Sequence, residues 1–317
     1  MENRCDVLYI VIPCYNEQAV LAQTATAVIN KLRQMVVQGL IHKSSKLVFV
    51  DDGSTDQTWQ TIQTLHQQND CVQGISLSKN SGHQNALLAG LLTVREFADM
   101  VISLDADLQD DIEVIPQFVK EYYHGFDVVY GVRSTRKTDG KFKRLSARGF
   151  YKLMHHMGVD IVYDHADYRL MSKRAIDSLA EFKEVNLFLR GIVPLIGFKT
   201  TTVSYERHSR AAGESKYPLK KMLSFAFDGI TSFSIRPIRM ITALGLLIFL
   251  CSIIMLIYFL VIYLSGNTVS GWTSTIISVW AIGGLELLSI GVVGEYIGKI
   301  YLETKHRPRF IVDQYLK

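Results

Sequence analysis

The feature that most constrains the fold is a short apolar run, residues 101–104, that ends abruptly in carboxylates. Three or four apolar residues followed by a polar turn predict a buried strand. Asp105 and Asp107 come directly after it, and Gln109 follows two residues later. In parallel α/β sheets the ligand crevice lies outside the carboxyl ends of the strands. Carboxylates at positions i and i+2, with an amide nearby, form an oxygen-donor set suited to Mg²⁺ or Mn²⁺.

The same residues have a simpler interpretation, because an acidic turn can cap the helix that follows it. For an isolated Asp-x-Asp sequence, a cap is the favoured interpretation. An EF-hand is excluded, because its loop glycine would fall on Asp110 and its closing glutamate on Pro116. The surrounding motifs must therefore decide between a cap and a metal site.

Two earlier apolar runs end in the same manner. Residues 8–12 lead into Pro13, Tyr15 and Glu17, and residues 46–50 lead into Asp51 and Asp52. Further strands are expected at residues 75–77, 126–130 and 201–205, with helical patterns between most of them. Strands that alternate with helices predict an α/β fold with a mostly parallel sheet. A dinucleotide dehydrogenase and a P-loop NTPase are not supported, since the sequence has neither a Gly-x-Gly-x-x-Gly after the first strand nor a Walker loop.

The C-terminal part contains two long apolar stretches. Residues 241–264 carry no charge, and residues 272–297 are interrupted only by Glu286 and Glu295. About 20 helical residues cross a bilayer core, so two transmembrane helices are predicted, at about 239–264 and 272–297. Basic residues flank the pair, so the positive-inside rule places both flanks, and with them the N-terminal part and both termini, in the cytoplasm, with the two helices in the cell (inner) membrane. The net charge of +4 is modest and its basic residues border these stretches, which argues against nucleic acid as a partner.

Residues 213–237 contain apolar residues at near-helical spacing beside lysines, a pattern typical of an interfacial amphipathic helix. Where this segment begins, Arg210 and Lys216 flank Gly213 in one loop that could clamp anionic oxygens. The alternative is a basic segment that rests on anionic lipid headgroups, and both roles are compatible. His165 is interpreted as structural, and His83 lies nearer the predicted site without an assigned role.

The chain resembles the inverting family-two glycosyltransferases of GT-A fold in three segments, each at the end of a predicted strand: residues 13–17, 51–56 and 105–109. The chain is similar to the polyprenyl-phosphate glycosyltransferases over essentially its whole length. Further segments carry this similarity: residues 80–84, 167–170 and 210–216, and the two C-terminal apolar stretches. That group includes the bactoprenol glucosyltransferases and, more distantly, the dolichol-phosphate mannose synthases.

The resemblance implies a role for individual residues. Asp105, Asp107 and Asp167 would be catalytic, and Asp167 either a base or an orienting group. The metal ligands would be Asp105, Asp107 and Gln109. Donor contacts would come from Pro13, Tyr15, Glu17, Val50, Asp52, Asp105, Ala106, Asp107, Gln109, Arg133, Arg210 and Lys216. Acceptor-phosphate contacts would come from Arg133, Arg144, Arg148, Arg210 and Lys216.

The expected organisation is a cytoplasmic catalytic domain (1–212), the interfacial segment (213–237), two transmembrane helices (238–298) and a cytoplasmic tail (299–317). The expected activity is transfer of a hexose, glucose from UDP-glucose, to undecaprenyl phosphate with inversion, to supply lipid-linked sugar for cell-surface glycan modification. Alternatives are another donor (GDP-mannose, UDP-N-acetylhexosamine or a UDP-modified arabinose), a processive synthase, or a non-catalytic membrane scaffold. A processive synthase usually carries a Gln-x-x-Arg-Trp motif, which this sequence lacks. By resemblance, the chain is also expected to form a homo-oligomer, a tetramer.

Overall fold

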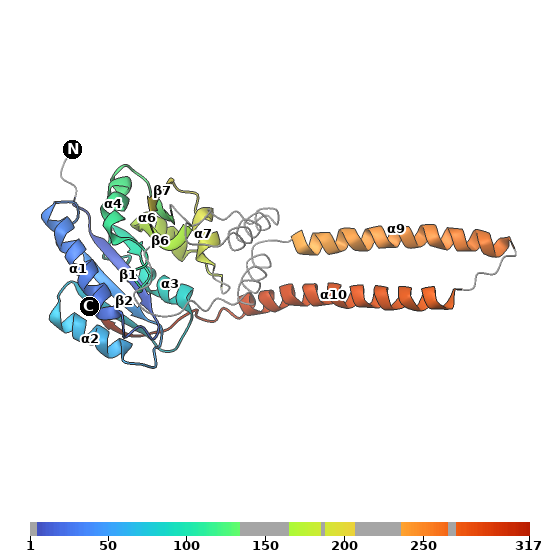
Figure 1. The fold of residues 1–317 in the computed structure, drawn as a ribbon, viewed down its shortest axis with the longest axis horizontal. Helices are drawn as coiled ribbons and strands as arrows, with labels where there is room; N and C mark the ends of the chain where they lie inside the picture. Colours follow the sequence, from blue (N-terminus) through green and yellow to red (C-terminus); the bar gives the residue numbers. More distant parts are fainter. Residues whose placement is uncertain (1–4, 134–164, 185–187, 207–235, 266–270) are drawn as a thin grey trace. The chain divides into compact units, whose positions relative to one another are not determined.

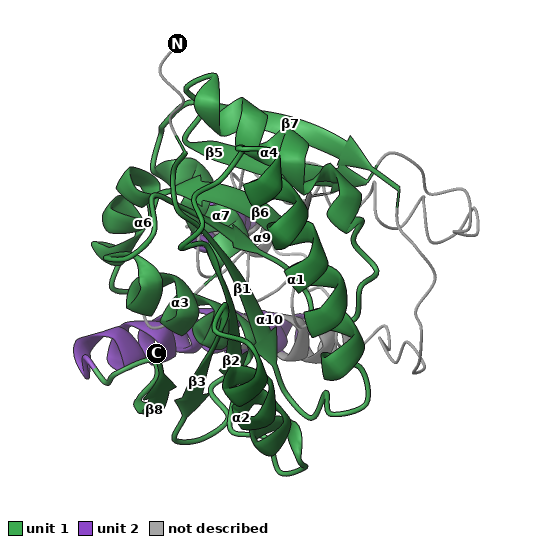
Figure 2. Ribbon diagram, turned by 90° about the vertical axis from the view of Figure 1, so that its left-hand side faces the viewer, with its two compact units in different colours: residues 1–151, 161–217, 307–317 green, residues 152–160, 218–306 purple. Residues whose placement is uncertain are grey.

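The computed structural model describes residues 5–133, 165–184, 188–206, 236–265 and 271–317. The chain divides into two compact units (Figures 1 and 2). The first contains residues 1–151, 161–217 and 307–317, and the second contains residues 152–160 and 218–306.

The first unit is built on a single eight-stranded sheet in the order β7-β5-β6-β4-β1-β2-β3-β8. Its strands are β1 (Leu8–Cys14), β2 (Lys46–Asp51), β3 (Val72–Leu77), β4 (Met100–Ser103), β5 (Val128–Arg133), β6 (His165–Ser172), β7 (Thr200–Tyr205) and β8 (Val312–Leu316). Strands β6 and β8 run antiparallel to their neighbours, and the other paired strands are parallel. The predicted α/β fold with a mostly parallel sheet is confirmed.

Helices cover both faces of the sheet (Figure 2). They are α1 (Leu21–Val37), α2 (Thr58–Gln68), α3 (His83–Val94), the short 3₁₀ helix η1 (Ile112–Val114), α4 (Ile115–Tyr123), α6 (Lys173–Ala180) and α7 (Leu189–Leu195). Strand β1 is buried at every position, as expected of a strand covered on both faces. Its alternate residues Leu8, Ile10 and Ile12 join the core cluster that contains the apolar face of α1.

Helix α3 packs against the other face at unusually short range. A Cβ atom added at Gly90 would lie 2.4 Å from Val11 Cγ1 and 2.8 Å from Val50 Cγ2, so only glycine permits this approach. The close packing fixes the helix axis against β1 and β2. It therefore also fixes the start of α3, where His83 lies.

Two strands were not anticipated from the sequence. Strand β6 was not among the expected strands, yet it pairs with β4 and β5. Strand β8 belongs to the segment interpreted as a cytoplasmic tail, yet it pairs antiparallel with β3. Tyr315 of β8 donates a hydrogen bond to Gln73 Oε1 at 2.9 Å, and the backbone N–H of Ser78 donates to the Ile311 carbonyl at 3.0 Å. Residues 311–316 are thus an integral part of the sheet of the first unit.

The second unit contains two long helices, α9 (Arg236–Leu264) and α10 (Trp272–Thr304). They coincide with the two apolar stretches, and large apolar side chains such as Leu247, Ile254 and Leu287 are exposed on them. The prediction that these two stretches form helices is confirmed, but the prediction that they cross a membrane is not. Within the residues that the structure describes, no helix is long and apolar enough to cross a membrane. The predicted interfacial segment lies outside the described residues, apart from its last two, which begin α9.

Candidate functional site

The topology brings polar residues from distant parts of the chain to one edge of the sheet. Strands β4, β1, β2 and β3 are parallel neighbours, so their carboxyl ends meet there. Strand β6 runs the opposite way, so its first residues lie at the same edge. The pairing of Ser103 with Arg169, continued by two residues, places Asp167 beside Asp105. This pairing creates the centre of the candidate site.

The loop after β4 carries the predicted metal ligands and is anchored by helix α1. Thr24 Oγ1 donates a hydrogen bond to the Ala106 carbonyl at 2.7 Å. The chain then turns through Leu108, which has a φ of 50°, and the Gln109 N–H donates to Asp107 Oδ1 at 3.2 Å. Gln109 is buried, whereas Asp105 and Asp107 are partly exposed. The two carboxylates are therefore accessible to a ligand.

The electrostatics of this loop suit a divalent cation. Burial raises the pKa of Asp105 to about 6; His83 opposes the shift, and the neighbouring carboxylates of Asp167, Asp110 and Asp107 add to it. A cation shared by Asp105 and Asp107 would relieve this repulsion. The described residues contain no cluster of three or more His, Cys, Asp or Glu side chains that could hold a metal alone. Mg²⁺ in proteins is commonly held by one or two carboxylates plus substrate phosphates and water, so the donor set fits a metal shared with a diphosphate.

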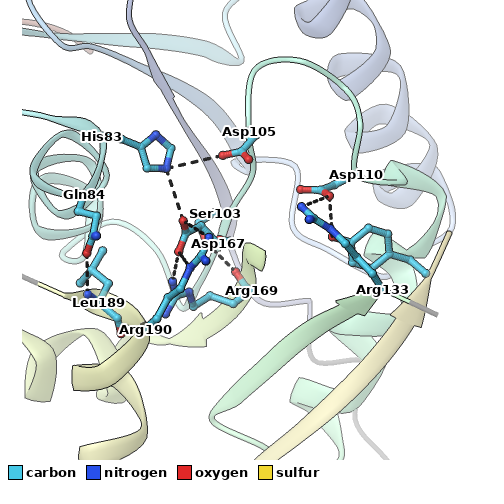
Figure 3. Close-up of polar contacts among 11 residues, drawn as sticks. His83, Gln84, Ser103, Asp105, Asp110, Arg133, Asp167, Arg169, Leu189 and Arg190 are labelled. Atoms are coloured by element: carbon cyan, nitrogen blue, oxygen red, sulfur yellow. Dashed lines mark hydrogen bonds and ion pairs between the residues drawn. The ribbon is translucent and has the colours of Figure 1, made fainter. Parts of the chain in front are cut away.

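Asp167 lies across from this loop and is held by two arginines (Figure 3). Its Oδ1 accepts hydrogen bonds from Arg169 Nη2 at 2.7 Å and Arg190 Nε at 3.2 Å, and its Oδ2 accepts one from Arg190 Nη2 at 3.0 Å. Although burial alone would raise it, Arg190 and Arg169 hold the pKa of Asp167 well below its usual range. A carboxylate that is this acidic and this fully engaged is a poor proton acceptor. The geometry favours an orienting role over a general base.

His83, which sequence reasoning left unassigned, lies between the two carboxylates. Its Nε2 is 3.7 Å from Asp105 Oδ1 and 3.7 Å from Asp167 Oδ2, and its side chain is 46% exposed (Figure 3). His83 is the first residue of α3 and comes six residues after β3 ends at Leu77, whereas Asp52 directly follows β2, so strand-end position alone did not identify it.

Asp52 was predicted to contact the donor, and the structure shows what its carboxylate does within the protein. Oδ1 accepts the N–H of Ser81 at 2.7 Å, and Oδ2 accepts the N–H of Gly82 at 2.9 Å. The residue is 2% exposed. Asp52 therefore fixes the loop that begins α3, and through it the position of His83.

Replacing Gly53 by alanine should destabilise the loops that hold the site. Gly53 has a φ of +65°, and an added Cβ would lie 2.6 Å from the backbone N of Asn80 and 2.6 Å from the backbone C of Lys79. We expect the free energy of unfolding to fall by about 1–3 kcal/mol, because the clash adds to the cost of positive φ. Gly39→Ala is the matched control, since Gly39 has a φ of +66° with nothing within 4 Å. Equal losses for the two variants in urea unfolding would contradict a role for the close approach.

The other predicted donor residues lie near the same edge with different accessibility. Pro13 and Val50 are paired on β1 and β2, and Val50 is fully buried beneath α3. Tyr15 is 46% exposed just beyond β1. The Glu17 N–H donates to Thr58 Oγ1 at 3.0 Å, which ties the β1 loop to α2. Val50 therefore supports the edge, whereas Tyr15 presents its ring there.

Arg133, the last residue of β5, is oriented by two partners. Its Nη2 lies 3.6 Å from Asp110 Oδ1, and its Nε donates to Tyr205 Oη at 3.4 Å. Tyr205 in turn donates to Asp110 Oδ1 at 2.5 Å. Neither Asp110 nor Tyr205 was assigned a role in the sequence analysis. The remaining predicted phosphate ligands lie outside the described residues: Arg144, Arg148, Arg210 and Lys216.

A mostly parallel sheet whose strand ends present paired carboxylates is the architecture of GT-A-like α/β proteins. Residues 9–180 match the glycosyl transferase family 2. The chain belongs to that family.

Relatives extend this match over the whole chain. An uncharacterised glycosyltransferase of Bacillus subtilis (strain 168) is 51% identical, over 99% of this chain and 93% of its own. A bactoprenol glucosyl transferase of Shigella phage SfV is 39% identical, over 96% of this chain and 97% of its own. Among solved structures, glucosyl-3-phosphoglycerate synthase from Mycobacterium tuberculosis is 17% identical with a TM-score of 0.45, over 71% of this chain and 78% of its own.

Proposed function

We propose that the protein transfers a hexose, glucose from UDP-glucose, to undecaprenyl phosphate and inverts the anomeric carbon. The observation that carries the proposal is the placement of Asp105 and Asp107 on one side of the site and the Asp167 cluster on the other. The similarity to a bactoprenol glucosyl transferase over nearly the full length supports a polyprenyl phosphate as the acceptor.

The proposed chemistry needs little from a general base. A phosphate oxygen of the acceptor attacks the anomeric carbon, and the bond from that carbon to the nucleoside diphosphate breaks. The attacking phosphate is already anionic at neutral pH, which agrees with the low pKa of Asp167. Bound Mg²⁺ or Mn²⁺, held by Asp105, Asp107 and Gln109, would stabilise the charge that develops on the departing diphosphate.

The proposed location is the cell membrane, with the catalytic unit and both termini in the cytoplasm. Exposed apolar side chains on α9 and α10 support contact with lipid. Strand β8, which follows α10 along the chain, belongs to the first unit, which supports assigning the C-terminal residues to the same compartment as that unit. A homo-oligomer is part of the same proposal. Glu286 is exposed on α10, and a neighbouring subunit would offer this carboxylate a partner.

A panel of donors tests the proposed function. The purified full-length protein is incubated with undecaprenyl phosphate, Mg²⁺ and radiolabelled UDP-glucose, GDP-mannose, UDP-N-acetylglucosamine or a UDP-modified arabinose. We expect a chloroform-soluble, acid-labile glycolipid with UDP-glucose. A lipid product with a different donor would correct the sugar, and no lipid product with any donor would overturn the proposal.

A further inference from the structure

We propose that His83 and Arg190 bind the phosphate of the acceptor lipid, in an anion subsite that faces the carboxylates of the β4 loop. This inference rests on the proposed function, because it assigns one of the two substrates of that reaction to particular side chains.

The charge of the Asp167 cluster is the first argument. Arg169 and Arg190 together carry two positive charges against the single negative charge of Asp167. The two arginines differ in exposure: the Arg169 side chain is 2% exposed, whereas the Arg190 side chain is 34% exposed. Arg190 is thus the cationic side chain of this cluster that a ligand can reach.

The spacing of the donor atoms is the second argument. His83 Nε2 lies 3.7 Å from the carboxylates of both Asp105 and Asp167. This distance is longer than a hydrogen bond, so neither carboxylate accepts a hydrogen bond from the ring. Arg190 Nη2 lies 3.0 Å from Asp167 Oδ2, the same oxygen that His83 approaches. The two nitrogens are thus within about 7 Å of each other, a separation that two oxygens of one phosphate can bridge.

A direct tether keeps the two residues together. Gln84, next to His83 at the start of α3, accepts a hydrogen bond through its Oε1 from the Leu189 N–H at 2.8 Å, and Leu189 precedes Arg190 (Figure 3). Asp52 fixes the same end of α3 from the other side through Ser81 and Gly82. The subsite is therefore built on positions that the protein holds in place before any ligand arrives.

In-line displacement supplies the third argument. The leaving diphosphate would lie with a metal held by Asp105 and Asp107, and in-line attack requires the acceptor phosphate to approach the anomeric carbon from the opposite side. The Asp167 cluster lies across from Asp105, with His83 between them. An anion held by His83 and Arg190 would therefore lie beside the β4 loop, on the side of Asp167.

The test compares His83→Ala and Arg190→Gln with wild-type protein. Each variant should raise the KM for undecaprenyl phosphate about 10- to 100-fold, as expected for a lost hydrogen bond to a charged group. The KM for UDP-glucose and the Kd for UDP should change less than about twofold. His124→Ala and Arg174→Gln are matched controls, because His124 and Arg174 are exposed and Arg174 pairs with Asp127 at the opposite end of β6.

Binding of farnesyl phosphate, measured without turnover, separates this inference from the proposed function. If the wild type makes no glycolipid, the proposed function fails, while loss of farnesyl phosphate binding in the variants would still support the subsite. Normal transfer by both variants, a parallel loss of UDP affinity, or a wild type that binds no farnesyl phosphate would overturn the inference. Should Arg190→Gln fail to fold, His83→Ala decides alone, since His83 makes no hydrogen bond to either carboxylate.

Discussion

Asp107→Asn is expected to lower sugar transfer about 100- to 1,000-fold while leaving the fold intact. The asparagine keeps an oxygen for the Gln109 N–H, so the turn after β4 is preserved. It removes the negative charge that a divalent cation requires, and the loss of one electrostatic partner of the transition state costs a factor of this size. Rates with radiolabelled UDP-glucose and undecaprenyl phosphate, at saturating Mg²⁺, provide the measurement.

Metal removal should reproduce this loss in the wild type. EDTA is expected to abolish transfer by the wild type and Mg²⁺ to restore it, whereas Asp107→Asn should respond to neither. Asp70→Asn, a change at an exposed aspartate after α2, serves as the control for a lost surface charge. Full activity of Asp107→Asn would contradict a metal site in the β4 loop. Loss of transfer without loss of cellular glycosylation would favour the scaffold alternative.

The elements that the sequence predicted well are those specified by local pattern. Six strands lie close to their predicted positions, and β1, β2 and β4 are the clearest cases because each is a short apolar run followed by a polar turn. Strands β6 and β8 lack that signature. Strand β8 contains Asp313 and Gln314 and pairs with residues more than 200 positions earlier, so only the assembled sheet reveals it.

The same division applies to the candidate site. Strand-end position drew attention to Asp105 and Asp107, and the surrounding motifs with the family resemblance favoured a metal site over a helix cap, whereas His83, six residues beyond β3, was left without a role. Arg190 could not be found in that way, because it follows no strand. Its approach to Asp167 depends on the antiparallel pairing of β6 with β4 and on the contact of Gln84 with Leu189. The role of Asp167 was equally hidden, since its acidity depends on two arginines brought together by folding.

The second large effect concerns stability, and Asp167→Asn is expected to lower the free energy of unfolding by about 3 kcal/mol at pH 7. Arg169 is 2% exposed, and the asparagine would leave its charge buried without a counter-charge. Removal of one partner from a buried ion pair typically costs about 3–5 kcal/mol, and the lower end applies because Arg190 can turn toward water. Chemical unfolding of the full-length protein in EDTA is the measurement.

The pH dependence of this loss has a definite sign. The pKa of Asp167 in the folded protein lies below its unfolded value of about 4, so its contribution is present above that pH and disappears as the pH falls. Wild type and Asp167→Asn should therefore converge in stability in acid.

Asp105→Asn is the matched comparison, for which the pH dependence of stability has the opposite sign. The pKa of Asp105 is raised to about 6, so its ionisation weakens the metal-free fold as the pH rises from about 4 to 6. Asp105→Asn should be at least as stable as the wild type at pH 7, and equal losses for the two variants would refute the opposed environments of these neighbouring carboxylates.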